Sequence, residues 1–433
     1  ICVLKNNNSV ITWGYSDYEK FFSYGGNSSN LKTFLSSNIK DIVKTDSAFC
    51  ALRFDGKIET WGHSNYGGNY THKYDEITDI SSITSNKYSM AAISNTGKLY
   101  TWGKYGRYHN NNWSILSSTQ TDSSTYESDV ETGITDIFYN LYSGIATKDD
   151  GNGFKKVCAY WGSSAAGGDP SHSTNGIRNH SGTIDLDLLN SNIKEIFVHG
   201  NTFFILKDDN KLYGWGGLMN TSIIDNTKLA TLTDISSIHF TENACAALKT
   251  NGEVITWGTN TNGGDKADGT YGVRNTSGNI ESSLLNSGSG VVSITSNFVS
   301  FCALKSNGTV LCWGNQNQGG NPYNTTVGYG MVKDMATSDM HSFVKITNSM
   351  SNKKFYSQGL TSEASKTMRY GFAGLRSDGA IIIWGLNTEV KGSITATELK
   401  NSRDFVDIKC GDEHGVFVGI KSNGSVALFG SSQ

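Results

Sequence analysis

The chain has 433 residues and a net charge of −3, with 49 Gly, only 2 Pro and 17% charged residues. Nucleic-acid binding needs clustered Lys and Arg, which the sequence lacks, and no apolar run is long enough for a membrane helix. Abundant Gly, Asn, Ser and Thr are instead typical of an all-β protein rich in turns.

A short unit of three strands recurs along the whole chain. Its clearest copy, at residues 291–314, has expected strands at 292–296, 300–305 and 309–313. Asn307 and Gly308 suit a tight hairpin turn because both residue types tolerate positive φ, and Trp313 with Gly314 closes the unit. Copies are expected to end near residues 14, 62, 103, 162, 216, 258, 314, 359, 385 and 430.

Several copies depart from this pattern, among them the last, which ends in Phe429 and Gly430. The copy at 331–359 has Gln358 where Trp is expected, and the next, at 367–385, is short. The first copy, which ends after Trp13, lacks its initial strand and leaves an exposed edge. We expect that the polypeptide either extends upstream of Ile1 or is processed. We also predict that a longer N-terminal region, or a neighbouring subunit, supplies the missing strands.

The period of the repeat determines the expected architecture. Repeats of roughly 40–60 residues are typical of propellers and solenoids, because one unit alone cannot bury both faces of its sheet. Radial stacking also protects the sheet edges. The sequence therefore predicts one propeller-type domain over residues 1–433, with three to four antiparallel strands in each blade and seven or more blades. A β-solenoid is the lesser alternative. The recurrent tryptophans are expected to pack between blades; they are Trp13, Trp61, Trp102, Trp161, Trp215, Trp257, Trp313 and Trp384.

The repeating unit has a recognisable motif: an Ile, then Ala-Leu-Lys, then the Asn-Gly turn, and finally Trp-Gly. This motif resembles the RCC1-like repeat (regulator of chromosome condensation type), in its short-repeat variety. In that family each copy is one propeller blade. The His that the family usually has in the middle strand is present only as His341 and His414. The resemblance implies a protein-binding propeller, with guanine-nucleotide exchange on a small GTPase, or inhibition of an enzyme, as alternatives.

A pair of glycines followed by Asn or Asp recurs six residues after the Trp. Paired glycines indicate unusual backbone angles, and the Asn or Asp can accept a hydrogen bond from its own backbone. One carboxylate in each loop is far short of the six to eight oxygens of a Ca²⁺ site, so we interpret the pairs as turns. They are Gly67, Gly68, Gly167, Gly168, Gly263, Gly264, Gly319 and Gly320.

Two long loops, after Trp161 and after Trp257, match each other at an offset of 96 residues. Each contains an arginine, which is expected either to order its own loop by binding carbonyls or to contact a partner. Long loops on one side of a repeat protein are where a partner would bind. The candidate interaction residues are Arg178, Arg274, Tyr15, Tyr66, Tyr105 and Trp113.

The nine His and seven Cys residues show no catalytic or zinc-type spacing. Cys2, Cys50 and Cys302 share one place in the middle strand, and we expect them to lie too far apart to bond with one another; nothing in the spacing pairs the others. Residues 149–153 faintly resemble a cation loop, which we interpret as an enlarged hairpin.

We therefore expect no catalytic residues, no metal and no cofactor. The prediction is a non-enzymatic interaction or structural scaffold that binds proteins, or copies of itself, but not nucleic acid. Composition leans towards a cell-surface, extracellular or virion component.

Overall fold

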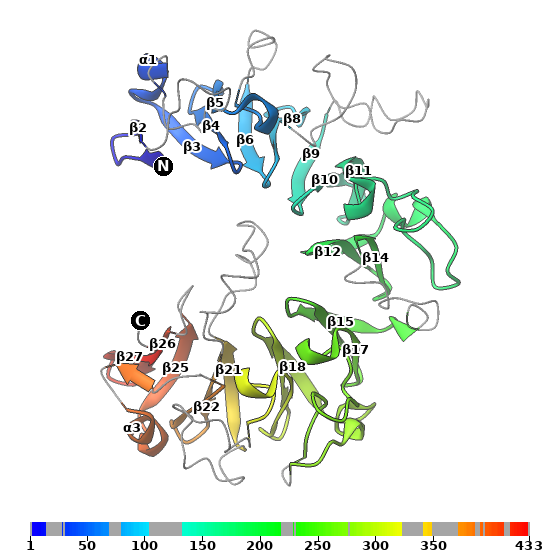
Figure 1. The fold of residues 1–433 in the computed structure, drawn as a ribbon, viewed down its shortest axis with the longest axis vertical. Coiled ribbons are helices and arrows are strands. Elements are labelled where there is room, and N and C mark those ends of the chain that lie inside the picture. The colour runs from blue at the N-terminus through cyan, green and yellow to red at the C-terminus, as the bar shows by residue number, and fades with distance from the viewer. Residues whose placement is uncertain are drawn as a thin grey trace. The chain divides into compact units, whose positions relative to one another are not determined.

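The computed structural model describes residues 2–13, 28, 31–68, 79–103, 132–217, 228, 231–275, 278–322, 341–348, 371–385, 390–392, 395–410 and 416–431. Over these ranges the chain folds mainly as small antiparallel sheets (Figure 1). Contacts divide it into two compact units, one built mainly from Ile1–Asp208 and the other mainly from Met219–Phe355 and Leu360–Gln433. Among the described residues, no helix has the length and apolar character needed to span a membrane.

The first half of the chain forms a two-stranded hairpin, two sheets of three strands and one sheet of six strands. In the six-stranded sheet, a single residue pair joins the third and fourth strands. The strands are β1 (Cys2–Leu4), β2 (Val10–Thr12), β3 (Ile39–Lys44), β4 (Ala48–Arg53), β5 (Ile58–Gly62), β6 (Ile80–Ser85), β7 (Ser89–Ser94), β8 (Leu99–Gly103), β9 (Ile134–Tyr139), β10 (Ser143–Asp149), β11 (Lys155–Gly162), β12 (Ile193–His199), β13 (Asn201–Lys207) and β14 (Leu212–Gly217).

The second half forms three sheets of three strands and one of four. Its strands are β15 (Ile235–Phe240), β16 (Ala244–Lys249), β17 (Val254–Gly258), β18 (Val291–Ser296), β19 (Ser300–Lys305), β20 (Val310–Gly314), β21 (Phe343–Asn348), β22 (Phe372–Arg376), β23 (Ile381–Trp384), β24 (Val390–Gly392), β25 (Phe405–Cys410), β26 (Val416–Lys421) and β27 (Val426–Ser431). The helices are short: α1 (Lys32–Leu35), α3 (Ala396–Asn401), and the 3-10 turns η2 (Ser64–Tyr66), η3 (Ser164–Ala166), η4 (Leu186–Leu189), η5 (Asn260–Asn262), η6 (Ser282–Leu285) and η7 (Gln316–Gln318).

The predicted all-β fold of propeller-type blades is confirmed. Within each three-stranded sheet the strands are consecutive in sequence and antiparallel, as in β18-β19-β20. A propeller blade is an antiparallel sheet of this kind, joined by short hairpins. The 3-10 turns and loops follow the last strand of a blade, so the fold presents them at a recurring position.

One expected boundary between units is wrong. β21 was expected in the unit ending near residue 359, and β22 and β23 in the unit after it. Instead β21 pairs with β22, with Asn348 opposite Phe372, and the three strands form one sheet. The physical reason is an insertion between the first and second strands, which separates partners that the Trp-Gly spacing treats as belonging to different units. Gln358, taken as the end of a unit, lies outside the described residues.

The two terminal sheets differ from the others. β1 and β2 form a sheet of only two strands in the described part of the chain, in keeping with the missing initial strand of the first unit. Trp13, which follows this hairpin, is 47% exposed and is not a core residue here. At the other end, β24 pairs with β27 as a fourth strand. Whether another segment or subunit completes the first blade stays a prediction.

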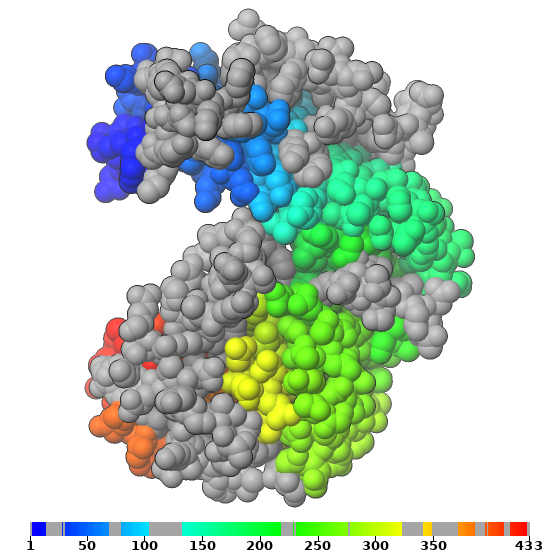
Figure 2. Space-filling model, in the orientation of Figure 1, coloured from blue at the N-terminus to red at the C-terminus, as the bar shows by residue number. Residues whose placement is uncertain are grey.

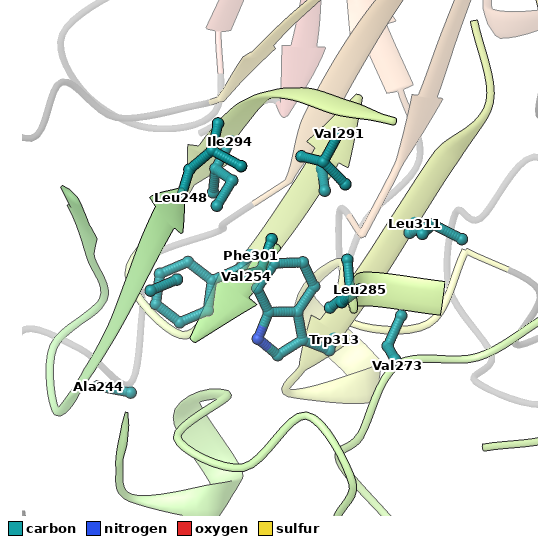
Figure 3. Packing of buried hydrophobic residues seen from close by; sticks show 12 residues of the cluster. Ala244, Leu248, Val254, Val273, Leu285, Val291, Ile294, Phe301, Leu311 and Trp313 are labelled. Carbon is teal, nitrogen blue, oxygen red and sulfur yellow. The ribbon is translucent and has the colours of Figure 1, made fainter. Parts of the chain in front are cut away.

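The core lies between successive blades. The remaining seven recurrent tryptophans are at most 5% exposed: Trp61, Trp102, Trp161, Trp215, Trp257, Trp313 and Trp384. In one cluster the ring of Trp313 stacks on Phe301 with centroids 5.2 Å apart, and both pack against Ala244, Leu248 and Val254 of the preceding blade (Figure 3). The aromatic pair of this blade is therefore buried against the neighbouring blade.

A left-handed residue precedes the first strand of most blades and turns the chain into it. Non-glycine examples have φ between 57° and 66°; they are Asn38, Asp79, Asn192, Asp234 and Ser342. The first residue of the strand then donates its N–H to the hairpin turn of the preceding blade, as Ile80 does to Gly56 O at 2.9 Å and Phe343 to Gly308 O at 3.0 Å. Asn and Asp tolerate this conformation, which explains their place before the strand.

His239 on β15 supplies a test of pH dependence. Burial lowers the pKa of this imidazole to about 4, and its Nε2 lies 3.0 Å from Ser237 Oγ. An unfolded His titrates near pH 6.5, so between about pH 6.5 and 4 the unfolded state binds the extra proton and acid favours unfolding. We expect His239 to lower the free energy of unfolding by up to about 3 kcal/mol across this pH window. The partial solvent exposure of the side chain makes the actual loss smaller.

The matched variant is His239→Thr, since β6 and β18 have Thr84 and Thr295 at the equivalent place in register. Urea unfolding at pH 7 and pH 5 should show a smaller loss of stability on acidification for the variant than for the wild type. Identical pH dependence in the two proteins would contradict the assignment.

Candidate interaction loops

The two near-duplicate loops, loop A (residues 169–192) and loop B (residues 265–290), each follow a Gly-Gly turn. The 3-10 turns η3 and η5 end at Gly167 and Gly263, whose φ values are 86° and 91°. The second glycine lies against the Trp-Gly end of its own blade, where a Cβ on Gly264 would overlap the carbonyl of Gly258. Both glycines are thus needed for the chain to fold back at this point.

The residue after each glycine pair uses its carboxylate in the turn. Asp169 Oδ1 accepts the N–H of Ser171 at 2.9 Å, and Asp265 Oδ1 accepts that of Ala267 at 2.8 Å. These are Asx-turns, in agreement with the turn interpretation. In the part of the chain that the structure describes, no three His, Cys, Asp or Glu side chains are grouped so that they could hold a metal ion.

A buried polar residue braces the glycine turn, and the sequence reasoning missed it. In the blade of β18, the Asn297 amide donates to Gln318 O at 2.7 Å, and its Oδ1 accepts the N–H of Ser300 at 2.8 Å. Three other blades have an equivalent donor to the residue before the first glycine; the donors are Thr45, Asn140 and Thr241. The available signal was a polar residue at a fixed place after the first strand.

Both loops are anchored in the core rather than laid over it. Val273 and Leu285 of loop B are fully buried and lie beside the Trp313 indole (Figure 3). In loop A, Ile177 and Leu189 occupy the same role beside the Phe203–Trp215 pair. These apolar positions, which match at the offset of 96, are therefore packing residues, and this explains why both loops have aliphatic side chains there.

Each loop also binds the Trp-Gly end of the next blade. Trp313 Nε1 donates to Gly263 O at 3.1 Å, and the N–H of Gly314 donates to Tyr271 O at 2.8 Å. The equivalent bonds at loop A run from Trp215 Nε1 to O of Gly167, in the glycine turn before the loop, at 3.0 Å, and from the N–H of Gly216 to O of Asn175, within the loop, at 2.8 Å.

The arginines order their own loops. Arg274 donates from Nη1 to Gly278 O at 2.7 Å and from Nη2 to Thr270 O at 2.8 Å. Arg178 donates in the same way to two carbonyls of loop A, those of Gly182 and Ser173. These bonds give the guanidinium groups the loop-ordering role, which is one of the two that the sequence left open. Contact of either arginine with a partner stays a prediction.

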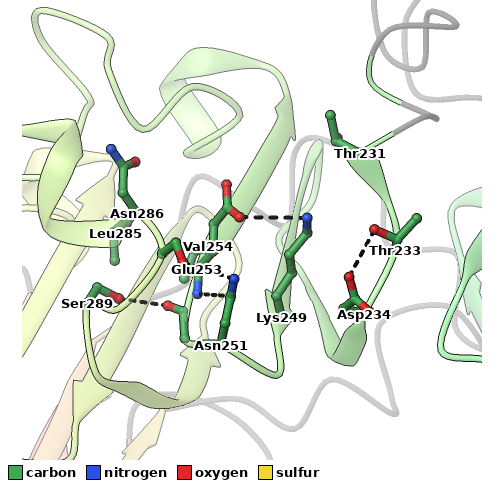
Figure 4. A network of polar contacts seen from close by, with 12 residues as sticks. Thr231, Thr233, Asp234, Lys249, Asn251, Glu253, Val254, Leu285, Asn286 and Ser289 are labelled. Carbon is green, nitrogen blue, oxygen red and sulfur yellow. Dashed lines mark hydrogen bonds and ion pairs between the residues drawn. The ribbon is translucent and has the colours of Figure 1, made fainter.

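The far end of loop B is fastened to the hairpin turn of its own blade (Figure 4). Ser289 Oγ donates to Gly252 O at 2.7 Å, and Asn251 Nδ2 donates to Ser287 Oγ at 3.1 Å. Beside this turn, Lys249 and Glu253 form an ion pair at 3.6 Å. Loop B is therefore held at its start, centre and end.

Of the remaining candidate residues, the structure describes only Tyr66. Tyr66 lies on η2, half-buried, with its ring 5.1 Å from His63 and 5.8 Å from Tyr88. Tyr15, Tyr105, Trp113 and the family-type His414 lie outside the described residues. Loops A and B belong to different compact units and are described separately.

Arg274→Lys should loosen loop B without unfolding the blade. Lysine keeps the charge but replaces the rigid fork with one ammonium group, so one carbonyl loses its partner, at a cost of about 1–2 kcal/mol. Amide hydrogen exchange should rise within loop B and stay unchanged in loop A. Arg403→Lys is the control, because the Arg403 side chain is 57% exposed. Unchanged exchange in loop B would contradict the clamp.

Residues 291–319, which contain β18, β19, β20 and the following turn, match the family described as Regulator of chromosome condensation (RCC1) repeat. This stretch of the chain is an RCC1-type repeat. The matched stretch is the type unit of the sequence, and its strand order and Trp-Gly end recur in the other blades described above. No curated protein sequence matches this chain significantly.

Several solved structures are similar to it at low identity. The CRINKLY WD40 ectodomain of the Arabidopsis thaliana receptor kinase ACR4 is 12% identical, with a TM-score of 0.31, over 72% of this chain and 90% of that one. Prp20p from Saccharomyces cerevisiae, described with its binding to Gsp1p and histones, is 13% identical, with a TM-score of 0.30, over 97% and 91%. Human WBSCR16 is 14% identical, with a TM-score of 0.31, over 64% and 77%. At these scores the similarities carry no argument about function.

Proposed function

We propose that this chain of RCC1-type repeats is a non-enzymatic protein-interaction scaffold, and that loops A and B form part of the surface that its partners contact. The observation that carries the proposal is the construction of the loops. Backbone bonds, an arginine clamp and two buried apolar anchors fix each loop before any partner arrives. A loop that is already ordered loses less conformational entropy on binding, so contacts made through it are more favourable.

The chemistry of the exposed side chains fits a protein partner. Loop B exposes Thr270, Asn279 and Glu281, and loop A exposes Ser181 and Thr183, so hydroxyl and amide groups dominate. Such groups supply adaptable hydrogen bonds around a binding surface. Figure 2 shows the light-green residues of the second unit, whose range includes loop B, as one continuous patch on the face in view. The elaborated loops, not the repetitive strands, distinguish these blades from the others.

The experiment is a binding comparison of matched variants of the full chain. Thr270→Arg with Asn279→Arg places two charges on exposed positions of loop B whose backbone bonds are kept. Val344→Arg, at a site 57% exposed on β21, adds charge outside both loops. A protein partner isolated on the wild type should bind the control equally and the loop variant at least about tenfold more weakly, a loss of about 1.4 kcal/mol.

If the loop B variant binds the partner as tightly as the wild type, loop B is not part of the binding surface. A similarly charged variant of loop A tests the assignment of loop A in the same way. Saturable turnover on an ester, phosphate or glycoside panel would overturn the non-enzymatic assignment. Stimulated nucleotide release from a small GTPase would replace the scaffold role with that of an exchange factor.

A further inference from the structure

Cys302 and Cys312 face each other inside the RCC1 repeat of β18, β19 and β20. They are direct cross-strand partners in the β19–β20 hairpin, and their sulfur atoms are 3.2 Å apart. Their relative exposures are 0% and 1%. Both side chains belong to the core that this blade shares with Phe343, Phe372 and Trp384 of the next one, and their sulfur atoms contact each other within it.

The register places these cysteines at the type of position where a disulfide fits. Antiparallel pairs alternate between hydrogen-bonded and non-hydrogen-bonded residues. Backbone bonds from Lys305 N to Thr309 O and from Asn315 N to Val299 O mark two hydrogen-bonded pairs of this hairpin. Counting along the strands from either one makes the cysteine pair non-hydrogen-bonded. In such pairs the Cα atoms lie about 4.5 Å apart, within the range spanned by disulfides.

Other blades show what is specific to this one. Cys50 on β4 occupies the same place as Cys302, but its cross-strand partner is Thr60. Cys2 on β1 likewise faces Thr12. The second cysteine at the facing position is therefore a feature of the β19–β20 hairpin. Spacing alone did not pair Cys302 with Cys312, because the pairing depends on the register of the two strands.

We propose that Cys302 and Cys312 form an intramolecular disulfide when the chain folds in the presence of a disulfide oxidant such as oxidised glutathione. The thiolate of one cysteine attacks an oxidant sulfur, forming a mixed disulfide and releasing one glutathione thiolate. The second cysteine then attacks the protein sulfur and releases the other glutathione. The two cysteines are oxidised, the oxidant is reduced to two thiols, and these take up the two protons.

The exchange takes place before the blade is packed. In the folded chain both sulfurs are shielded from solvent, and burial raises the pKa of the Cys302 thiol well above its usual value. A buried, protonated thiol is a poor nucleophile, so a chain that folds reduced remains reduced. The oxidation state of the pair in the folded protein therefore depends on the redox conditions during folding.

The test refolds the full chain with oxidised glutathione or with dithiothreitol, then denatures it, alkylates free thiols and maps the peptides by mass. After oxidative refolding, the peptide containing both cysteines should be two hydrogens lighter and resist alkylation. Cys50 and Cys245 should be alkylated in both samples. Oxidative refolding should also raise the Tm by a few degrees, because the staple restricts the unfolded chain.

Two variants keep the test decisive. Cys312→Thr installs the residue found opposite Cys50, and it should fold without the disulfide and show no redox-dependent Tm. Thr60→Cys creates a second facing pair with the same register and should gain a second disulfide. Complete alkylation of Cys302 and Cys312 in folded protein from the oxidising sample would overturn the proposal. A pairing of either residue with another cysteine would overturn it as well.

Discussion

Trp313→Ala should lower the free energy of unfolding by about 3–5 kcal/mol, because it removes a large side chain from a fully packed site. Trp313 is completely buried, stacks on Phe301 and donates from Nε1 to Gly263 O. The cavity would open between two blades and beneath loop B, so neighbouring elements cannot collapse into it easily. Urea unfolding followed by far-UV circular dichroism measures the change without depending on the tryptophan that is lost.

The control for this substitution is Trp13→Ala. Trp13 ends a unit in the same way but is 47% exposed beside a two-stranded hairpin. Its removal should cost less than about 1 kcal/mol, since it vacates little packed volume. A second variant, Trp313→Phe, keeps most of the apolar contact but loses the hydrogen bond to Gly263. If Trp313→Ala and Trp13→Ala destabilise the protein equally, the assignment of a core between blades is wrong.

Gly264→Ala should destabilise the protein by at least about 3 kcal/mol, because the site has no room for a methyl group. The new Cβ would overlap the backbone of Gly258, which ends β17, and backbone atoms cannot move aside as a flexible side chain can. Either the Gly-Gly turn opens or the Trp-Gly end of the strand shifts. Thermal and urea unfolding report the loss, and hydrogen exchange should locate it at the start of loop B.

Gly269→Ala is the matched control within the same loop. A Cβ at that position meets nothing within 4 Å. Its stability should stay within about 0.5 kcal/mol of the wild type, as is usual for an exposed substitution. Wild-type stability in the Gly264→Ala protein would show that the turn accepts a side chain and that the glycine pair has another purpose.

Local chemistry made much of the fold predictable. The strands expected at 292–296 and 309–313 appear as Val291–Ser296 and Val310–Gly314, because apolar alternation and an Asn-Gly turn determine such a hairpin within a few residues. The pairing of β21 with β22 could not be predicted in the same way. It joins strands separated by an insertion, so it depends on contacts that no local pattern encodes.

The features of the candidate loops were likewise predictable only where they depend on local sequence. Their glycine turns and their duplication were visible in the sequence. The arginines were left with two roles, because the choice between a loop carbonyl and a partner depends on distances in three dimensions. Asn297 was missed since a polar residue after a strand normally indicates a solvated turn, whereas here it is buried and bonded. The pairing of Cys302 with Cys312 could not be predicted either, because it depends on the register of β19 against β20.

The bonds between a glycine turn and the following tryptophan have a direction. Gly263 belongs to the blade of β15–β17, yet it accepts the hydrogen bond of Trp313 in the next blade along the chain, and Gly167 serves Trp215 likewise. At these two places the earlier blade covers the tryptophan of its successor, not that of its predecessor. The stability of a repeat array is approximately the sum of the stability of each repeat and of the interfaces between neighbours. Disruption of one of these two glycine turns should therefore weaken the following blade more than the preceding one. A blade inserted or exchanged at such a place would need a glycine turn that can accept the hydrogen bond from the tryptophan of the following blade.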